Sequence, residues 1–160
     1  MNINERNTIF RKALATYRQG DTRAAARVFR GLIEDGSNDP QHLSYHGLSI
    51  GLAEGKLEEG TRLCVRALRA APYDPQMYLN LARVHFRARR NSLAVDVLRK
   101  GLRIDEDNRA LLRELERINP RRTPPLDFLS RSHPVNRYIG LTRARLWRLF
   151  GGQKVSHVMC

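Results

Sequence analysis

The feature that most constrains the fold of this chain is an internal repetition with a period of 34 residues between Gly55 and Asn108. In each copy, small and apolar residues recur three or four positions apart, which is the spacing of one face of an α-helix. The matching pairs are Gly60 and Ala94, Cys64 and Leu98, Ala67 and Gly101, and Leu68 and Leu102. Self-similarity at this period, with helical spacing inside each unit, predicts a stacked array of helical hairpins.

The second copy, together with the helix expected before it, resembles the tetratricopeptide repeat. The family's aromatic, small and apolar positions correspond to Tyr78, Leu81, Ala82, Ala94, Leu98, Gly101 and Leu102. The resemblance implies an all-α fold, a right-handed superhelical solenoid of about three helical hairpins. It also implies that the chain is a protein-interaction module.

Capping residues indicate where the helices of these hairpins begin. Asp39 with Pro40, and Asp74 with Pro75, repeat one arrangement 35 residues apart. In each pair the Asp caps a helix, and the Pro takes its first position, where a missing N–H costs nothing. The predicted repeat domain, residues 5–118, consists of repeats at about 5–39, 40–74 and 75–108 and a capping helix at 108–118.

The capping helix is predicted from one apolar face behind a capping residue. Asp107 is the expected N-cap, and the apolar face consists of Leu111, Leu112, Leu115 and Ile118. A terminal helix of this kind covers the apolar face that the last repeat would otherwise expose. Glu114 and Glu116 are expected on its exposed face, among arginines.

Prolines separate this domain from a basic tail. Residues 119–135 are expected to form a linker, because Pro120, Pro124 and Pro125 interrupt helical structure. Residues 136–160 form the tail, with a basic C-terminal helix expected between Asn136 and Phe150. The tail surface is predicted at Arg143, Arg145, Trp147 and Arg148. Such a basic amphipathic helix suits docking on the solenoid or a partner, which we favour, or an anionic membrane or nucleic acid.

Arginine dominates the charge of the chain. Its 25 Arg and 4 Lys outnumber 16 acidic residues, so that the formal net charge is +13. This excess attracts acidic proteins, anionic membranes or nucleic acid, although solvated arginines on helix faces explain it equally well before residue 120. Nucleic acid is the least favoured partner, because few aromatic residues are interleaved with the arginines.

The expected location is cytoplasmic, with a peripheral position at the inner face of a membrane left open. Two cysteines, Cys64 and Cys160, do not make a disulfide framework. The N-terminal residues contain no apolar segment of the kind found in secretory signals, and no apolar run approaches the ~18 residues of a membrane-spanning helix.

The resemblance also implies a site for a partner, because the first helix of each hairpin lines a concave groove in this family. The groove positions of the third repeat are Gln76, Leu79, Arg83, Phe86 and Arg87, and Arg113 and Arg117 continue this surface onto the capping helix. Guanidinium groups pair bidentately with carboxylates, and an aromatic ring takes an apolar side chain. The predicted partner is therefore an extended acidic peptide or protein segment, unless these arginines are simply solvated.

A different carboxylate site, found in some members of the family, is expected to be absent here. Those members hold a C-terminal carboxylate with a set of Lys and Asn residues. In this chain Phe10, Leu14 and Gln76 stand at the corresponding positions.

No catalytic constellation is present in the sequence, so no enzyme activity is expected. There is no Gly-rich phosphate loop, no GxSxG motif and no pair of carboxylates in an apolar context. His42 and His46 could reach one metal ion from adjacent turns of a helix, but no third ligand is placed. No metal or cofactor is expected.

Taken together, these features predict an adaptor or scaffold that binds a partner through its concave groove. The alternatives are a peripheral membrane or secretion-associated adaptor anchored by the tail and, less favoured, an RNA-binding protein.

Overall fold

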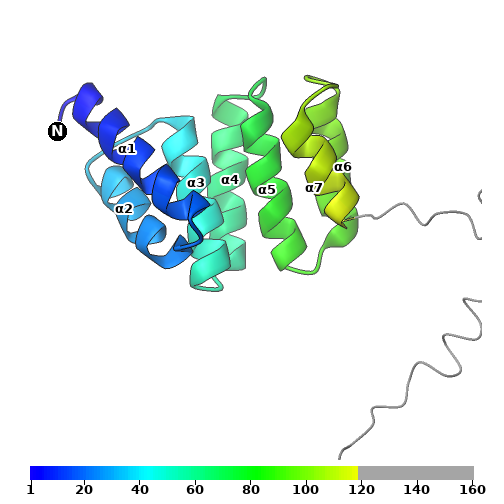
Figure 1. Cartoon of the computed structure of the whole chain (residues 1–160), viewed down its shortest axis with the longest axis horizontal. Helices are drawn as coiled ribbons and strands as arrows, with labels where there is room; N and C mark the ends of the chain where they lie inside the picture. The colour runs from blue at the N-terminus through cyan, green and yellow to red at the C-terminus, as the bar shows by residue number, and fades with distance from the viewer. Residues whose placement is uncertain (119–160) are drawn as a thin grey trace, which may run out of the picture. The chain divides into compact units, whose positions relative to one another are not determined.

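The computed structural model describes residues 1–118, which form seven α-helices and, within that range, no β-strand (Figure 1). The helices are α1 (Ile3–Arg18), α2 (Thr22–Glu34), α3 (Pro40–Ala53), α4 (Leu57–Ala70), α5 (Pro75–Arg87), α6 (Asn91–Leu102) and α7 (Arg109–Ile118). The predicted all-α solenoid of helical hairpins with a capping helix is confirmed. The predicted linker 119–135 and the tail surface at Arg143, Arg145, Trp147 and Arg148 lie outside the described residues.

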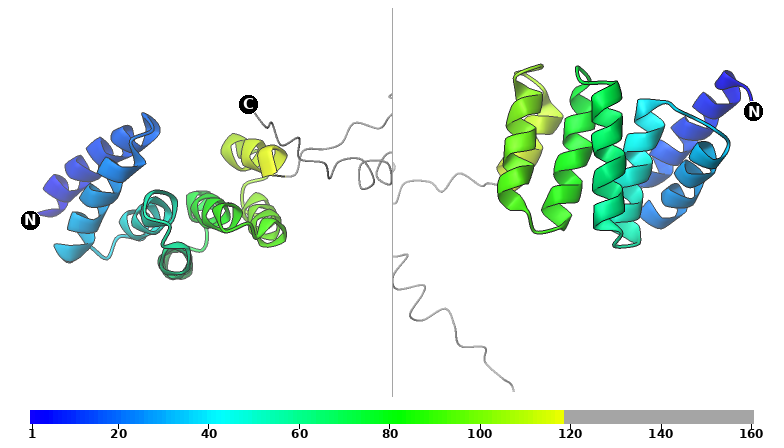
Figure 2. Two further views of the ribbon diagram at one scale, coloured as in Figure 1. Left: turned by 90° about the horizontal axis from the view of Figure 1, so that it is seen from below. Right: turned by 180° about the vertical axis from the view of Figure 1, so that it is seen from behind.

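Consecutive helices pack against each other as hairpins, and the hairpins stand side by side in a row. α1 packs on α2, α3 on α4, and α5 on α6, while α7 covers α6 and also contacts α5. Seen from below, the row of described helices has α1 and α7 at its two ends (Figure 2, left).

Most helix starts follow from local capping, as the sequence predicts. The carboxylate of Asp39 accepts a hydrogen bond from the backbone N–H of Gln41, at 2.7 Å, and Asp74 accepts one from Gln76, at 2.8 Å. Pro40 and Pro75 take the first helical positions. These side chains satisfy backbone donors that a helix leaves free at its N-terminus.

The predicted cap of the last helix is wrong by one residue. Asn108, rather than Asp107, accepts hydrogen bonds from the backbone N–H groups of Ala110 and Leu111, both at 3.1 Å. α7 accordingly begins at Arg109. Either side chain could serve as a cap chemically, and the path of the preceding turn decides which one does.

The turns inside the hairpins share one backbone conformation. Gly20, Gly55 and Arg89 stand between the two helices of successive hairpins, with φ values of 98°, 70° and 62°. Glycine adopts this left-handed conformation at no steric cost, whereas a side chain makes it unfavourable. The third hairpin therefore keeps the geometry of the first two with a residue that is strained there.

The core consists of three clusters of buried residues, against which the partly buried Leu68 and Val97 pack as links, and α3 is buried along most of its length. Every residue from His42 to Gly51 is buried, because α2, α4 and α5 all pack on this helix. One polar side chain of α3 finds a partner across a helix seam, where Asn80 Nδ2 donates to Ser44 Oγ at 3.0 Å. Such a bond offsets the cost of burying polar groups.

α3 and α4 approach each other most closely at a pair of glycines. A Cβ atom on Gly60 would lie 2.5 Å from the carbonyl oxygen of Gly47, and one on Gly47 would lie 2.7 Å from the carbonyl oxygen of Gly60. The backbones of α3 and α4 can approach this closely only because neither Gly47 nor Gly60 has a side chain.

Candidate functional site

The candidate site lies where α1, α5 and α7 bring charged and aromatic side chains together. We call these residues the inner-surface cluster: Tyr17, Arg83, Phe86, Glu114 and Arg117. Three of them, Arg83, Phe86 and Arg117, were predicted from the sequence to line a groove. Two others, Tyr17 and Glu114, were not.

Glu114 stands at the centre of the cluster and holds α7 against α5. Its Oε2 accepts a hydrogen bond from Arg83 Nε at 3.0 Å, and its Oε1 accepts two from Arg117, one from Nε at 2.9 Å and one from Nη2. The Glu114 side chain is only 7% exposed, against 29% for Arg83 and 53% for Arg117. Three charge-assisted hydrogen bonds from two arginines thus satisfy a carboxylate that is almost fully buried.

The burial of Glu114 corrects the expectation that it lies on an exposed helix face. Its neighbour on the same helix, Glu116, is exposed as expected. On an isolated α7 Glu114 would face water, but α5 covers this side of the helix and supplies the cation of Arg83. A neighbouring helix, and not the local pattern, decides its burial.

Tyr17 links the first hairpin to this cluster. Its ring packs on that of Tyr45 from α3, with centroids 5.9 Å apart. Burial raises the pKa of the Tyr17 hydroxyl, and the guanidinium of Arg83 beside it partly offsets that rise. Tyr17 therefore remains a protonated hydrogen-bond donor next to Arg83 at neutral pH.

Phe86 provides an aromatic face within the same group. The guanidinium carbon of Arg117 stands 4.5 Å from the centroid of the Phe86 ring. A cation over the ring face is attracted by the ring's quadrupole, so this contact orients Arg117 while its other side pairs with Glu114. The ring itself is half-buried.

The remaining residues predicted for the groove lie in different surroundings. Gln76 donates from its side chain to Asn80 Oδ1 at 2.8 Å. Leu79 is 4% exposed and packs in the core with Ala82 and Leu98, so it offers almost no surface to a partner.

Two further predicted arginines are free of carboxylate partners within residues 1–118. Arg87 and Arg113 are exposed, and Arg113 donates only to the carbonyl oxygen of Arg109, at 3.1 Å. Arg87 follows Arg83 by one helical turn on α5, and Arg113 precedes Arg117 by one turn on α7. Each therefore adds a positive charge to the same helix face, one turn away from the cluster.

Three histidines are buried in the described helices: His42, His46 and His85. Among the described residues, no group of three His, Cys, Asp or Glu side chains could hold a metal ion. His42 Nδ1 lies 2.7 Å from Ser37 Oγ, while His46 Nδ1 and His85 Nδ1 are buried without a partner in this part of the chain. Burial lowers the pKa of all three histidines, so each is held in its neutral form.

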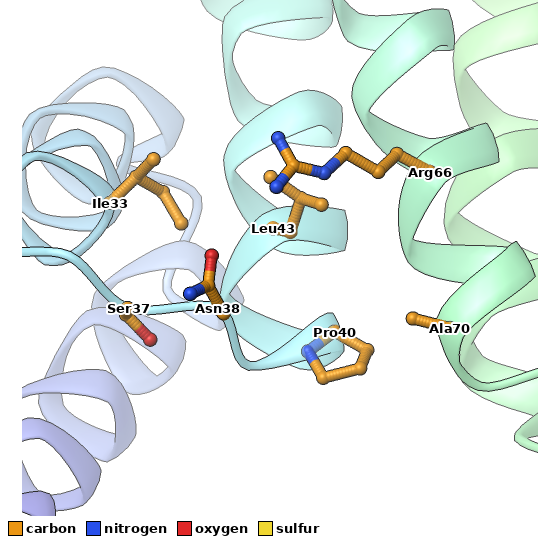
Figure 3. Close-up of a pocket in the computed structure, with 7 residues that line it drawn as sticks. All are labelled: Ile33, Ser37, Asn38, Pro40, Leu43, Arg66 and Ala70. Atoms are coloured by element: carbon orange, nitrogen blue, oxygen red, sulfur yellow. The ribbon is translucent and has the colours of Figure 1, made fainter.

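A separate pocket of 370 Å³ opens between α2, the start of α3 and α4 (Figure 3). Its lining consists of Ile33, Ser37, Asn38, Pro40, Leu43, Arg66 and Ala70. Arg66 is the only charged residue in this lining, and its guanidinium extends across the pocket toward Leu43. The pocket lacks the convergent titratable groups that catalysis would require.

None of the described helices is both long and apolar enough to cross a lipid bilayer.

Comparisons with known proteins agree with this architecture. Residues 51–117 match the family described as tetratricopeptide repeat. No curated protein sequence matches the chain.

Three solved structures with similar folds are tetratricopeptide repeat domains. The domain of Arabidopsis OM64 has a TM-score of 0.61 and 14% identity, covering 76% of this chain and 100% of that one. The domain of Sgt2 from Aspergillus fumigatus has a TM-score of 0.60 and 14% identity, covering 98% and 89%. The first such domain of RPAP3 (Spaghetti), solved with the HSP90 peptide SRMEEVD, has a TM-score of 0.60 and 14% identity, covering 74% and 95%.

Proposed function

We propose that this tetratricopeptide repeat protein is a non-catalytic adaptor that binds an acidic segment of a partner protein on its inner surface. The observation that carries the proposal is the grouping of Arg83 and Arg117 on one carboxylate, with Phe86 under Arg117 and with Arg87 and Arg113 one turn away on the same helices. Guanidinium groups recognise carboxylates, and the part of the Phe86 ring that stays exposed can contact an apolar side chain of the partner.

The charge of the described region supports an acidic partner. Residues 1–118 contain 21 basic and 15 acidic residues, and the cluster itself sets two cations against one carboxylate. Complementary charge raises the rate of association and disfavours basic partners.

One structural relative offers a parallel. The first tetratricopeptide repeat domain of RPAP3 was solved with an HSP90 peptide that contains consecutive glutamates and a terminal aspartate. Our proposal differs in the residues that do the binding. In this chain Phe10 is buried against Phe29 and Tyr45 and offers no cation, and we assign the anion contacts to the arginines of α5 and α7.

A binding measurement with matched charge reversals tests the proposal. The probe is a fluorescein-labelled polyglutamate peptide, followed by fluorescence anisotropy at low and at physiological salt. The test variant combines Arg87→Glu with Arg113→Glu, which spares the contacts that hold Glu114. The control combines Arg62→Glu with Arg69→Glu on α4, which are equally exposed and change the net charge by the same amount.

We expect the α5–α7 variant to weaken binding by about tenfold, since two lost surface ion pairs contribute up to ~2 kcal/mol together, the introduced glutamates repel the peptide, and 1.4 kcal/mol corresponds to one decade. The α4 variant should lose less than about threefold, through long-range charge alone. Equal losses for the two variants would show that the peptide senses only net charge, and the proposal would then be wrong.

A further inference from the structure

We infer that Glu114 occupies a carboxylate-binding site of the inner surface, and that a carboxylate of an acidic partner binds to Arg83 and Arg117 in exchange for it. The inference rests on the proposed function, because it specifies how the same surface takes its partner. It adds that the free protein is self-occupied: α7 supplies the anion that the partner later replaces.

The geometry is that of a ligand site and its ligand. Guanidinium groups from two helices converge on one carboxylate, with Arg83 from α5 on Oε2 and Arg117 from α7 on Oε1. Arg83 uses only its Nε for this contact. Because a guanidinium can pair bidentately, the contact between Arg83 and Glu114 is less complete than the one that a free carboxylate could make with Arg83, whereas Arg117 already donates from both Nε and Nη2.

The exposed fractions of Glu114, Arg83 and Arg117 are consistent with exchange. Glu114 is 7% exposed, whereas Arg83 and Arg117 are 29% and 53% exposed. An approaching acidic peptide therefore meets the cations before it meets the internal anion. Two cations with one anion also leave an unbalanced positive charge, which favours a second carboxylate.

The neighbours of the pair can accept the incoming group. The hydroxyl of Tyr17 lies beside Arg83 and remains protonated, so it can donate to a carboxylate that arrives from the α1 side. Phe86 keeps Arg117 in place through its ring.

Releasing Glu114 need not unfold α7. This helix is anchored in the core by Leu111, which is fully buried, and by Ile118. In the proposed exchange the Glu114 side chain rotates toward water, and the partner's carboxylate takes its place on Arg83 and Arg117. Exchange therefore conserves the number of charge contacts in the cluster.

The test compares two isosteric variants of one helix. Glu114→Gln removes the internal anion, whereas Glu116→Gln removes the same charge from an exposed position with no ion pair in the described residues. Both are titrated with the polyglutamate peptide and checked for folding by circular dichroism. Glu114→Gln should bind the peptide about tenfold more tightly than wild type, since a competing charge-assisted contact worth ~1.5 kcal/mol is gone. Glu116→Gln should tighten binding less than about twofold.

The outcomes separate this inference from the proposed function. If Glu114→Gln binds no more tightly than wild type, while reversal of Arg87 and Arg113 still weakens binding, exchange is wrong and the adaptor proposal stands. If neither wild type nor Glu114→Gln binds the peptide, both are wrong.

A second measurement covers the case in which Glu114→Gln does not fold. In the wild-type protein, the side-chain carboxyl ¹³C resonance of Glu114 should move on saturation with the peptide, because the carboxylate leaves its two arginines. A resonance that stays in place while the peptide binds would overturn the inference.

Discussion

Replacement of Gly60 by alanine tests the close approach of α3 and α4. In the structure the new Cβ atom would lie 2.5 Å from the carbonyl oxygen of Gly47 and 3.5 Å from the Cα of Gly51. Both obstacles are backbone atoms, so no side-chain rotation relieves the clash, and α4 must move away from α3. The same substitution at Gly31, in the last turn of α2, meets nothing within 4 Å.

The two substitutions share one favourable effect and differ in the clash. Alanine in a helix interior is favoured over glycine by about 1 kcal/mol, which Gly31→Ala should gain in full. Overpacking a seam costs about 1–3 kcal/mol, and two rigid backbones place Gly60→Ala at or above the upper end of that range. The net change for Gly60→Ala is therefore a loss of about 2 kcal/mol.

Thermal melts followed by circular dichroism measure both changes. At about 4 °C per kcal/mol for a unit of this size, Gly60→Ala should lower Tm by about 8 °C and Gly31→Ala should raise it by about 4 °C. Urea titrations give the corresponding free energies of unfolding. A Gly60→Ala protein as stable as wild type would refute the reasoning, because it would show that the helices do not meet at this pair.

Three further predictions concern other parts of the fold. Ala94 is fully buried between α5 and α6, so Ala94→Leu should cost about 1–3 kcal/mol in a thermal melt, and wild-type stability would contradict this packing. Arg89→Gly should stabilise the protein by about 0.5–1 kcal/mol, since glycine tolerates the φ of 62°, and a lower Tm would argue against strain there. The pKa values of His42, His46 and His85 are lowered in the folded chain, so below about pH 6.5 the unfolded chain binds more protons than the folded chain. The free energy of unfolding should therefore be highest above that pH. It should fall on acidification toward the folded-state pKa values, by at most ~1.4 kcal/mol per pH unit and histidine. Equal urea midpoints at neutral and mildly acidic pH would contradict it.

The helices were predictable because their signals are local. Asp39 with Pro40, and Asp74 with Pro75, combine a capping side chain and a fixed φ within two residues, so their role does not depend on distant parts of the chain. The 34-residue period then sets which helices are neighbours, since each repeat can bury its apolar face only against the next.

The candidate site was less predictable, because it depends on contacts between helices. The sequence of α7 alone predicts an exposed Glu114, and this side chain is buried only because α5 packs on α7 and places Arg83 against it. Tyr17 lies far from both in the sequence, and no spacing rule connects α1 with α5. The choice between Asp107 and Asn108 as cap likewise needed the path of the turn.

The location of the acidic peptide on the folded protein is the most direct test of the central claim. Backbone amide chemical shifts of the full chain can be mapped during titration with the polyglutamate peptide. The account predicts that the largest shifts gather on α5 and α7 around Arg83, Phe86 and Arg117, with the end of α1 near Tyr17 also affected. Shifts that concentrate on α2 and α4, or only on residues after Ile118, would contradict it.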